Sequence, residues 1–116
     1  MTAPAEGPPP PQIERTRRQR VLLGGKLVYG QFDFTADCTI RDLTEAGARI
    51  RIGAEVKVPD QMWLISVASG MAYRAVAAWR RGTELGLRFD ESIDLKPSTS
   101  PAPLHIRQLW LETAAR

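Results

Sequence analysis

The chain has 116 residues, of which 43% are hydrophobic and 25% charged, values that are ordinary for one compact globular domain with a modest core. No apolar run approaches the roughly 18–20 residues needed to span a bilayer, so we expect no membrane insertion. Sixteen Lys and Arg against thirteen Asp and Glu give a net charge of +3, a small excess that makes nucleic acid an unlikely partner.

The N-terminal part of the chain has two distinct compositions. Residues 1–12 contain five prolines and few large apolar side chains, which predicts a disordered or polyproline-like tail. This stretch lacks the apolar core of a signal peptide, so we expect a cytoplasmic protein. Residues 14–20 then hold four arginines, which form a local site for an anion or for nucleic acid. They are Arg15, Arg17, Arg18 and Arg20.

The middle of the chain has the pattern of short strands. Apolar residues alternate with arginine between Ala48 and Ile52, which is typical of a strand with one solvated face. Gly24 and Gly25 interrupt the first apolar run and indicate a bulge or a sharp bend. Strand-like runs separated by turn residues occur at 21–29, 38–41, 48–52, 62–67, 71–79 and 84–89. This spacing predicts a mainly β fold, a six-stranded antiparallel barrel over about residues 20–90.

The C-terminal part begins with a stretch rich in proline and serine and continues with apolar residues at helical spacing. Residues 97–103 predict a linker, and Leu104 to Ala115 predict a short amphipathic helix that docks on the barrel or on a partner. The expected organisation is tail, barrel domain with its arginine segment, linker and helix, over residues 1–12, 13–96, 97–103 and 104–116.

The residue types needed for catalysis or metal binding are scarce. One cysteine, Cys38, and one histidine, His105, exclude an internal disulfide and a cysteine-based zinc site. We interpret Cys38 as a small hydrophobe in a strand. The chain has no glycine-rich phosphate loop, and the carboxylates are scattered. We therefore expect a protein that is not an enzyme and that holds no metal or cofactor.

One turn carries polar residues that can bind a ligand, the sequence Asp42-x-Thr44-x-x-Gly47. An ionised Asp42 can accept hydrogen bonds from donor groups of a ligand. Thr44 offers a short hydroxyl, and Gly47 offers a positive φ angle or a close backbone approach. The structural alternative is that Asp42 and Thr44 cap a tight turn and that Gly47 is a turn residue. Farther along the chain we interpret Trp79 and Phe89 as core residues and Gly86 as a strand bend.

Taken with the arginine segment, this turn resembles the PilZ domain family, the bacterial receptors for cyclic di-GMP. The family signature is RxxxR before the first strand and [D/N]xSxxG in the barrel. The resemblance covers about residues 14–90, including 38–49 and 79–89. No two arginines of residues 14–20 are four apart, and Thr44 stands where the family has serine. The resemblance implies a PilZ-like barrel that binds cyclic di-GMP through Arg15, Arg17, Arg18, Arg20, Asp42, Thr44 and Gly47.

Two functions follow from this resemblance. The first is a cyclic di-GMP-binding signalling module that transmits nucleotide binding to an unidentified protein partner. The second is a degenerate PilZ-like adaptor that binds no nucleotide and acts through protein–protein contacts, an alternative that the incomplete arginine motif supports. A nucleic-acid-binding barrel and a hydrolase or transferase are weaker alternatives, because the net charge is small and no acid–base or metal set is present.

Overall fold

The computed structural model describes residues 19–115, with side chains described from Leu23 onward. The predicted tail of residues 1–12 and the positions Arg15, Arg17 and Arg18 lie outside the described residues. Within this part of the chain no helix has the length and apolar character needed to cross a membrane. The elements are β1 (Gln19–Tyr29), β2 (Phe34–Leu43), β3 (Gly47–Arg51), β4 (Gln61–Ser66), β5 (Met71–Arg81), β6 (Glu84–Asp94) and α1 (Leu104–Ala114).

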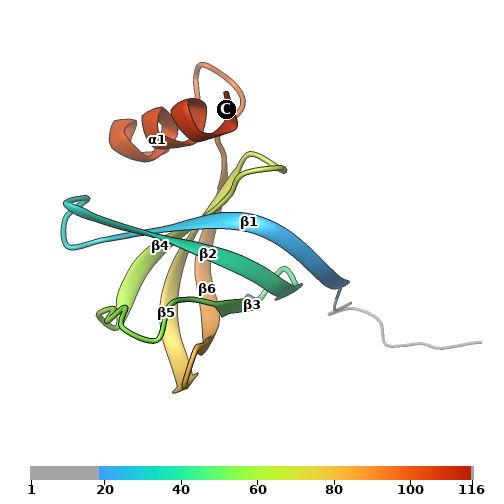
Figure 1. Ribbon diagram of the computed structural model, residues 1–116. Coiled ribbons are helices and arrows are strands. Elements are labelled where there is room, and N and C mark those ends of the chain that lie inside the picture. The colour runs from blue at the N-terminus through green and yellow to red at the C-terminus, as the bar shows by residue number, and fades with distance from the viewer. Residues whose placement is uncertain (1–18, 116) are drawn as a thin grey trace, which may run out of the picture.

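The six strands form a closed barrel in the order β1-β2-β3-β6-β5-β4, and every neighbouring pair is antiparallel. Figure 1 shows the helix α1 lying against the outside of this barrel. The predicted mainly β fold with a six-stranded antiparallel barrel and a C-terminal helix is therefore confirmed. Two strands are longer than the sequence pattern indicated, since β2 begins at Phe34 and β6 continues to Asp94. Their extra residues pair with β1 and β5, which a local pattern does not reveal.

The strand β1 is irregular at a different place from the one predicted. The register of β1 against β2 shifts between Arg20 and Leu23, whereas Gly24 and Gly25 pair regularly with β2. The prediction of a bulge at the two glycines is therefore wrong, because the irregularity lies a few residues before them. A Cβ atom on Gly25 would lie 2.9 Å from the Sγ atom of Cys38. Gly25 thus makes room for a buried neighbour, without being a bulge residue.

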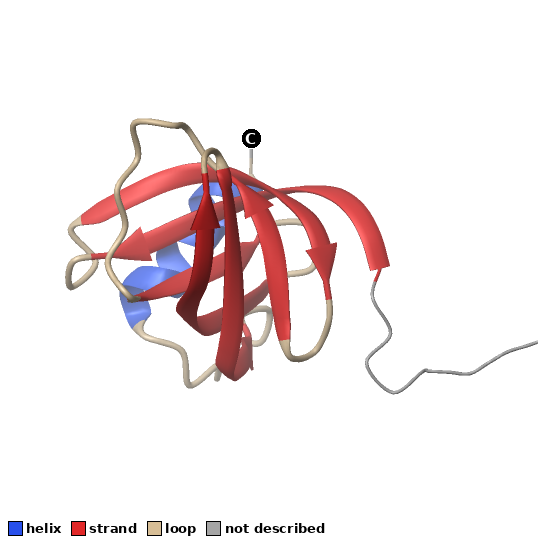
Figure 2. Ribbon diagram, turned by 90° about the horizontal axis from the view of Figure 1, so that it is seen from below, coloured by secondary structure: helices blue, strands red, loops and turns tan. Residues whose placement is uncertain are grey.

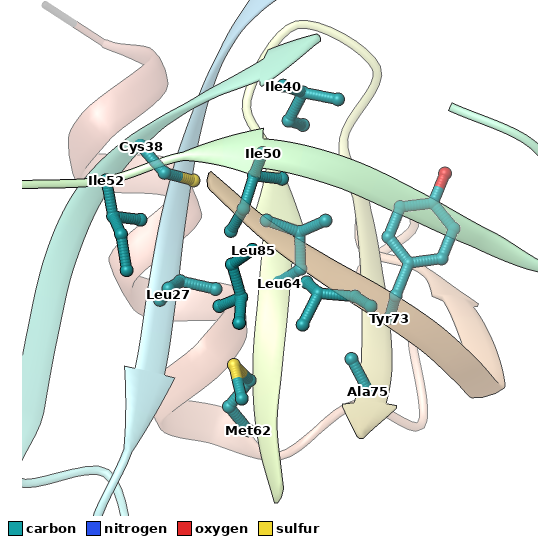
Figure 3. Packing of buried hydrophobic residues seen from close by; sticks show 11 residues of the cluster. Leu27, Cys38, Ile40, Ile50, Ile52, Met62, Leu64, Tyr73, Ala75 and Leu85 are labelled. Atoms are coloured by element: carbon teal, nitrogen blue, oxygen red, sulfur yellow. The ribbon is translucent and has the colours of Figure 1, made fainter. Parts of the chain in front are cut away.

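The interior of the barrel is filled by side chains that alternate along each strand. Figure 3 shows these side chains converging from all six strands. Cys38 is buried among them, as predicted for a small hydrophobe, and burial raises the pKa of its thiol to about 12. The buried members of this cluster are Leu27, Cys38, Ile40, Ile50, Ile52, Met62, Leu64, Tyr73, Ala75, Leu85 and Leu87.

A second apolar cluster lies between the barrel and α1. Ile106 of the helix is fully buried against it. The indole Nε1 of Trp110 donates a hydrogen bond to the carbonyl oxygen of Val67 at 2.9 Å, and Nε of Arg107 donates to that of Leu95 at 2.8 Å. Figure 2 shows the helix on the outer side of the strands. The helix therefore docks on the barrel, the first of the two possibilities that its sequence left open.

Candidate functional site

Thr44 closes the turn between β2 and β3. Its Oγ1 accepts hydrogen bonds from the backbone N–H groups of Ala46 at 3.1 Å and Gly47 at 3.0 Å. The N–H of Thr44 also donates to the carbonyl oxygen of Gly47 at 2.9 Å. This is the turn-capping arrangement expected for a short hydroxyl side chain. Thr44 therefore has a role in the fold whether or not a ligand is bound.

Gly47 allows two strands to approach closely. A Cβ atom at this position would lie 2.2 Å from the carbonyl oxygen of Leu87 in β6, a distance that no side chain tolerates. Gly47 does not have a positive φ angle. Among the described glycines, those with a positive φ angle are Gly30, Gly70 and Gly82. Of the two reasons for a glycine that the sequence suggested, close backbone approach is the correct one.

Asp42 is buried and paired with an arginine. The register of β2 against β3 shifts between Ile40 and Asp42, and the Asp42 side chain is only 5% exposed. Nε of Arg49 donates to Oδ2 of Asp42 at 2.5 Å, and Nη1 of Arg49 donates to Oε2 of Glu84 at 2.9 Å. The hydrogen bond to Asp42 raises the pKa of Arg49, and the charges of both carboxylates add to this effect. The ion-pair cluster holds the Arg49 guanidinium in one orientation.

Arg49 and Glu84 were not among the predicted site residues, although the position of Arg49 was predictable. Asp42 and Arg49 are direct cross-strand neighbours in the β2–β3 hairpin. A turn centred on residues 44–47 sets that pairing, and opposite charges on facing positions stabilise a sheet. Glu84 joins the cluster through the pairing of β3 with β6, which are far apart in the sequence. The sequence carries no local signal for that contact.

A pocket of about 290 Å³ opens beside the β2–β3 turn. Its lining brings together the three predicted barrel residues, Asp42, Thr44 and Gly47, with Arg49 and Arg88. Arg88 lies directly opposite Gly47 in the pairing of β3 with β6, and its side chain is exposed. The pocket thus combines a buried carboxylate with two guanidinium groups that can bind an anion or the edge of a purine.

Trp79 forms one wall of this pocket, and its predicted place in the core is wrong. Its side chain is 41% exposed and lies against Gly86, where an added Cβ atom would be 2.1 Å from the indole Nε1. The register of β5 against β6 shifts between Ala77 and Trp79, and a bulge reverses the direction of the following side chain. The guanidinium carbon of Arg81 lies 5.6 Å from the ring centroid of Trp79. An exposed indole among arginines is a surface on which a base can stack.

Phe89, the other expected core aromatic, packs as predicted. It is partly buried against the barrel cluster. Its ring stacks on that of Tyr73 with the centroids 4.2 Å apart. Phe89 therefore contributes to the core and is separate from the pocket.

The predicted arginine segment joins the barrel next to the pocket. Arg20 pairs with Asp42 in the ladder between β1 and β2, and Gln19 pairs with Leu43. Because these pairs end the ladder, β1 begins beside the β2–β3 turn. The side chain of Arg20 lies outside the described part, as do Arg15, Arg17 and Arg18. The backbone register therefore brings one end of the arginine segment to the predicted barrel residues.

The chain matches no known protein-family model, and no curated protein is significantly similar to it. Among residues 19–115, no group of three or more His, Cys, Asp or Glu side chains is arranged to hold a metal ion. The site is therefore characterised by its own geometry, a pocket with a buried carboxylate, fixed and exposed arginines and an exposed indole.

Proposed function

We propose that the protein is a bacterial, cytoplasmic module of the PilZ type that binds cyclic di-GMP and transmits this binding to a partner protein. One observation carries the proposal. The pocket lined by Asp42, Thr44, Gly47 and Trp79 lies beside the point where the arginine segment joins β1. The backbone of Arg20, the last residue of the arginine segment, thus pairs with that of Asp42, the first residue of the turn motif, although more than twenty residues separate them in the chain.

The chemistry of the pocket suits one half of a cyclic dinucleotide. A guanine base can stack on the exposed face of Trp79. The guanidinium of Arg88 can grip a phosphate or the O6/N7 edge of the base. The ion pairs of Arg49 use two of the five N–H donors of its guanidinium, so this group can also donate to a ligand.

The size of the pocket supports a role for the arginine segment in this proposal. At about 290 Å³ the pocket is at the lower limit of typical small-molecule sites, which span about 300–1,000 Å³. It is open and can enclose a base with its phosphate but not a whole dinucleotide. In this proposal the arginines of residues 15–20 cover the second half of the ligand. Contact of that segment with the ligand would change the surface that the barrel presents to a partner.

A second candidate function is a PilZ-like adaptor that binds no nucleotide. The contacts of the turn favour it, because each motif residue also serves the fold. Thr44 closes the turn, Gly47 permits strand pairing, and Asp42 forms an ion pair with Arg49. Such a motif can persist after ligand binding is lost. The spacing of the arginines, none of which are four apart, supports the same alternative.

Calorimetric titration distinguishes the two functions. We expect cyclic di-GMP to bind the wild-type chain in the micromolar range, and cyclic di-AMP, which lacks the guanine O6 and N2 groups, to bind far more weakly. Charged hydrogen bonds are worth about 1.5–3 kcal/mol, so Arg88→Ala and Arg20→Ala should each weaken binding by roughly one to two decades. Trp79→Ala should weaken it through loss of stacking.

Arg74→Ala is the matched control for these arginine variants. Arg74 is exposed and lines a different pocket, so this change should leave the affinity for cyclic di-GMP unchanged. A wild-type chain that gives no heat at about millimolar ligand would establish the adaptor function instead. Equal binding by wild type and by the Arg88, Arg20 and Trp79 variants would show that the nucleotide binds elsewhere.

A further inference from the structure

The outward face of α1 carries two exposed leucines one heptad apart. Residues that face the barrel, above all Ile106, are buried, and the opposite face is exposed along Leu104, Gln108 and Leu111. Leu104 is 77% exposed and Leu111 is 38% exposed. Residues seven apart lie on the same side of a helix. A helix that has already buried one face therefore presents two leucines, with Gln108 between them, to solvent.

The β1–β2 hairpin adds an aromatic ring to this surface. The ring of Phe32 lies 5.7 Å from that of His105 in the first turn of α1, and Phe32 is 37% exposed. Figure 1 shows the β1–β2 turn beside one end of the helix. Gln31 and Phe32 have φ angles of 59° and 74°, a conformation that is unfavourable for side chains other than glycine. The hairpin therefore holds Phe32 at an exposed position in spite of backbone strain.

We propose that this surface, formed by Leu104, Leu111 and Phe32, pairs with a second copy of the chain. The two α1 helices would run antiparallel about a two-fold axis that passes near Gln108. In that arrangement Leu104 of each copy packs on Leu111 of the other, so both leucines of both helices are buried. This reciprocal pairing is what a two-fold interface requires.

Hydrogen-bond and dipole complementarity support a second copy as the occupant. His105 lies near the start of the helix and Glu112 near its end, and both are exposed on the side next to the leucine stripe. Antiparallel pairing brings each His105 close to Glu112 of the other copy, where an imidazole N–H can donate a hydrogen bond to the carboxylate. It also aligns the positive end of one helix dipole with the negative end of the other, which is favourable.

The size of the surface predicts a weak dimer. The helix has 11 residues and is about 16 Å long. A stable interface usually buries about 800 Å² on each partner, which a helix of this length does not reach alone. The aromatic side chain at the hairpin must therefore contribute, and we expect a dissociation constant in the micromolar range.

Sedimentation velocity on the full chain between about 1 and 500 µM tests the proposal. We expect wild type to change from monomer to dimer over this range. Leu104→Glu and Leu111→Lys should each weaken the dimer at least about tenfold, because each change removes two buried leucines from a symmetric interface. A glutamate in the first turn and a lysine in the last turn both favour the helix, so a loss of dimer would not reflect a loss of α1. Ala54→Glu, which adds the same charge at an exposed loop position remote in sequence from α1, should have no effect.

Mixing the two variants tests the antiparallel register. A mixed dimer of Leu104→Glu and Leu111→Lys contains one Glu–Lys pair and one intact Leu–Leu pair, so it should be tighter than either variant alone. Phe32→Gly should weaken the wild-type dimer while relieving the backbone strain. The proposal would be overturned if the wild-type chain stayed monomeric at about 500 µM, the highest concentration tested. A dimer that Leu104→Glu leaves unchanged, or a mixture without recovery, would also overturn it.

Discussion

At Gly47 the backbone of β3 passes so close to β6 that hydrogen is the only side chain that fits. The nearest atom to a hypothetical Cβ is a backbone oxygen, that of Leu87, and it cannot rotate away as a side chain could. The same strand pair carries Arg88 into the pocket opposite Gly47. The closeness of β3 and β6 is therefore both a requirement of the barrel and the means by which the pocket is assembled.

Replacing Gly47 tests this requirement directly. We expect Gly47→Ala to lower the free energy of unfolding by about 2 kcal/mol or more, because β3 or β6 must move to relieve the clash. Gly24→Ala is the matched control, since a Cβ atom there meets nothing within 4 Å. It should be neutral or stabilising by up to about 1 kcal/mol. Urea unfolding followed by circular dichroism measures both, and equal effects at the two glycines would contradict this account.

At the scale of single elements, the β1–β2 hairpin has a turn that its sequence does not favour. The N–H of Asp33 donates to the carbonyl oxygen of Gly30 at 3.2 Å, and the two residues between them have positive φ angles. Positive φ angles at both residues inside the hydrogen bond are typical of a type I′ turn, and Gly30 before them also has a positive φ angle. Such turns prefer Asn-Gly at the central positions, whereas this chain has Gln31 and Phe32. Pairing of the long strands on either side imposes the turn.

The strain in this turn predicts a stabilising substitution. Gln31→Gly should raise the free energy of unfolding by about 0.5–1 kcal/mol, because glycine adopts a positive φ angle without the steric penalty of a side chain. Gln61→Gly is the control, an exposed glutamine in β4 that has no positive φ angle. It should lower stability by about 0.5–1 kcal/mol. Thermal and urea unfolding measure the stability of both variants. If Gln31→Gly were destabilised as well as Gln61→Gly, the turn assignment would be wrong.

At the scale of the whole molecule, two apolar clusters share the strands. One cluster fills the barrel, and the other lies under α1 and includes Val28, Trp63 and Ile65. Neighbouring residues of a strand thus face opposite clusters, as Leu64 and Ile65 do in β4. A strand buried on both faces depends on the helix for half of its burial. The helix is therefore part of the core of the molecule.

Removal of the helix should consequently weaken the whole fold. A chain that ends at Lys96 loses Ile106 and the hydrogen bond from Trp110 to Val67, and it exposes the second cluster. We expect the free energy of unfolding to fall by at least about 3 kcal/mol and the Tm to fall by about 10 °C or more. Binding of a hydrophobic dye should rise. The double variant Leu104→Glu and Leu111→Lys keeps the helix, so it should unfold like wild type at low micromolar concentration.

The sequence by itself determined the fold class, because its signals are local. Alternation between Ala48 and Ile52 fixes which side of a strand is apolar, and turn residues at regular spacing fix where strands end. The turn of Thr44 and the amphipathic helix from Leu104 follow from the same kind of signal. Each of these features depends on residues only a few positions apart.

Only the tertiary structure decided what lines the pocket and what the surface presents. Trp79 continues the apolar alternation of Tyr73, Ala75 and Ala77, which in a regular strand would place it inside the barrel. A register shift turns it outward onto Gly86. Glu84 reaches Arg49 only because β6 pairs with β3 when the barrel closes. Bulges and strand closure depend on contacts between distant segments, and a pattern within one segment does not contain them.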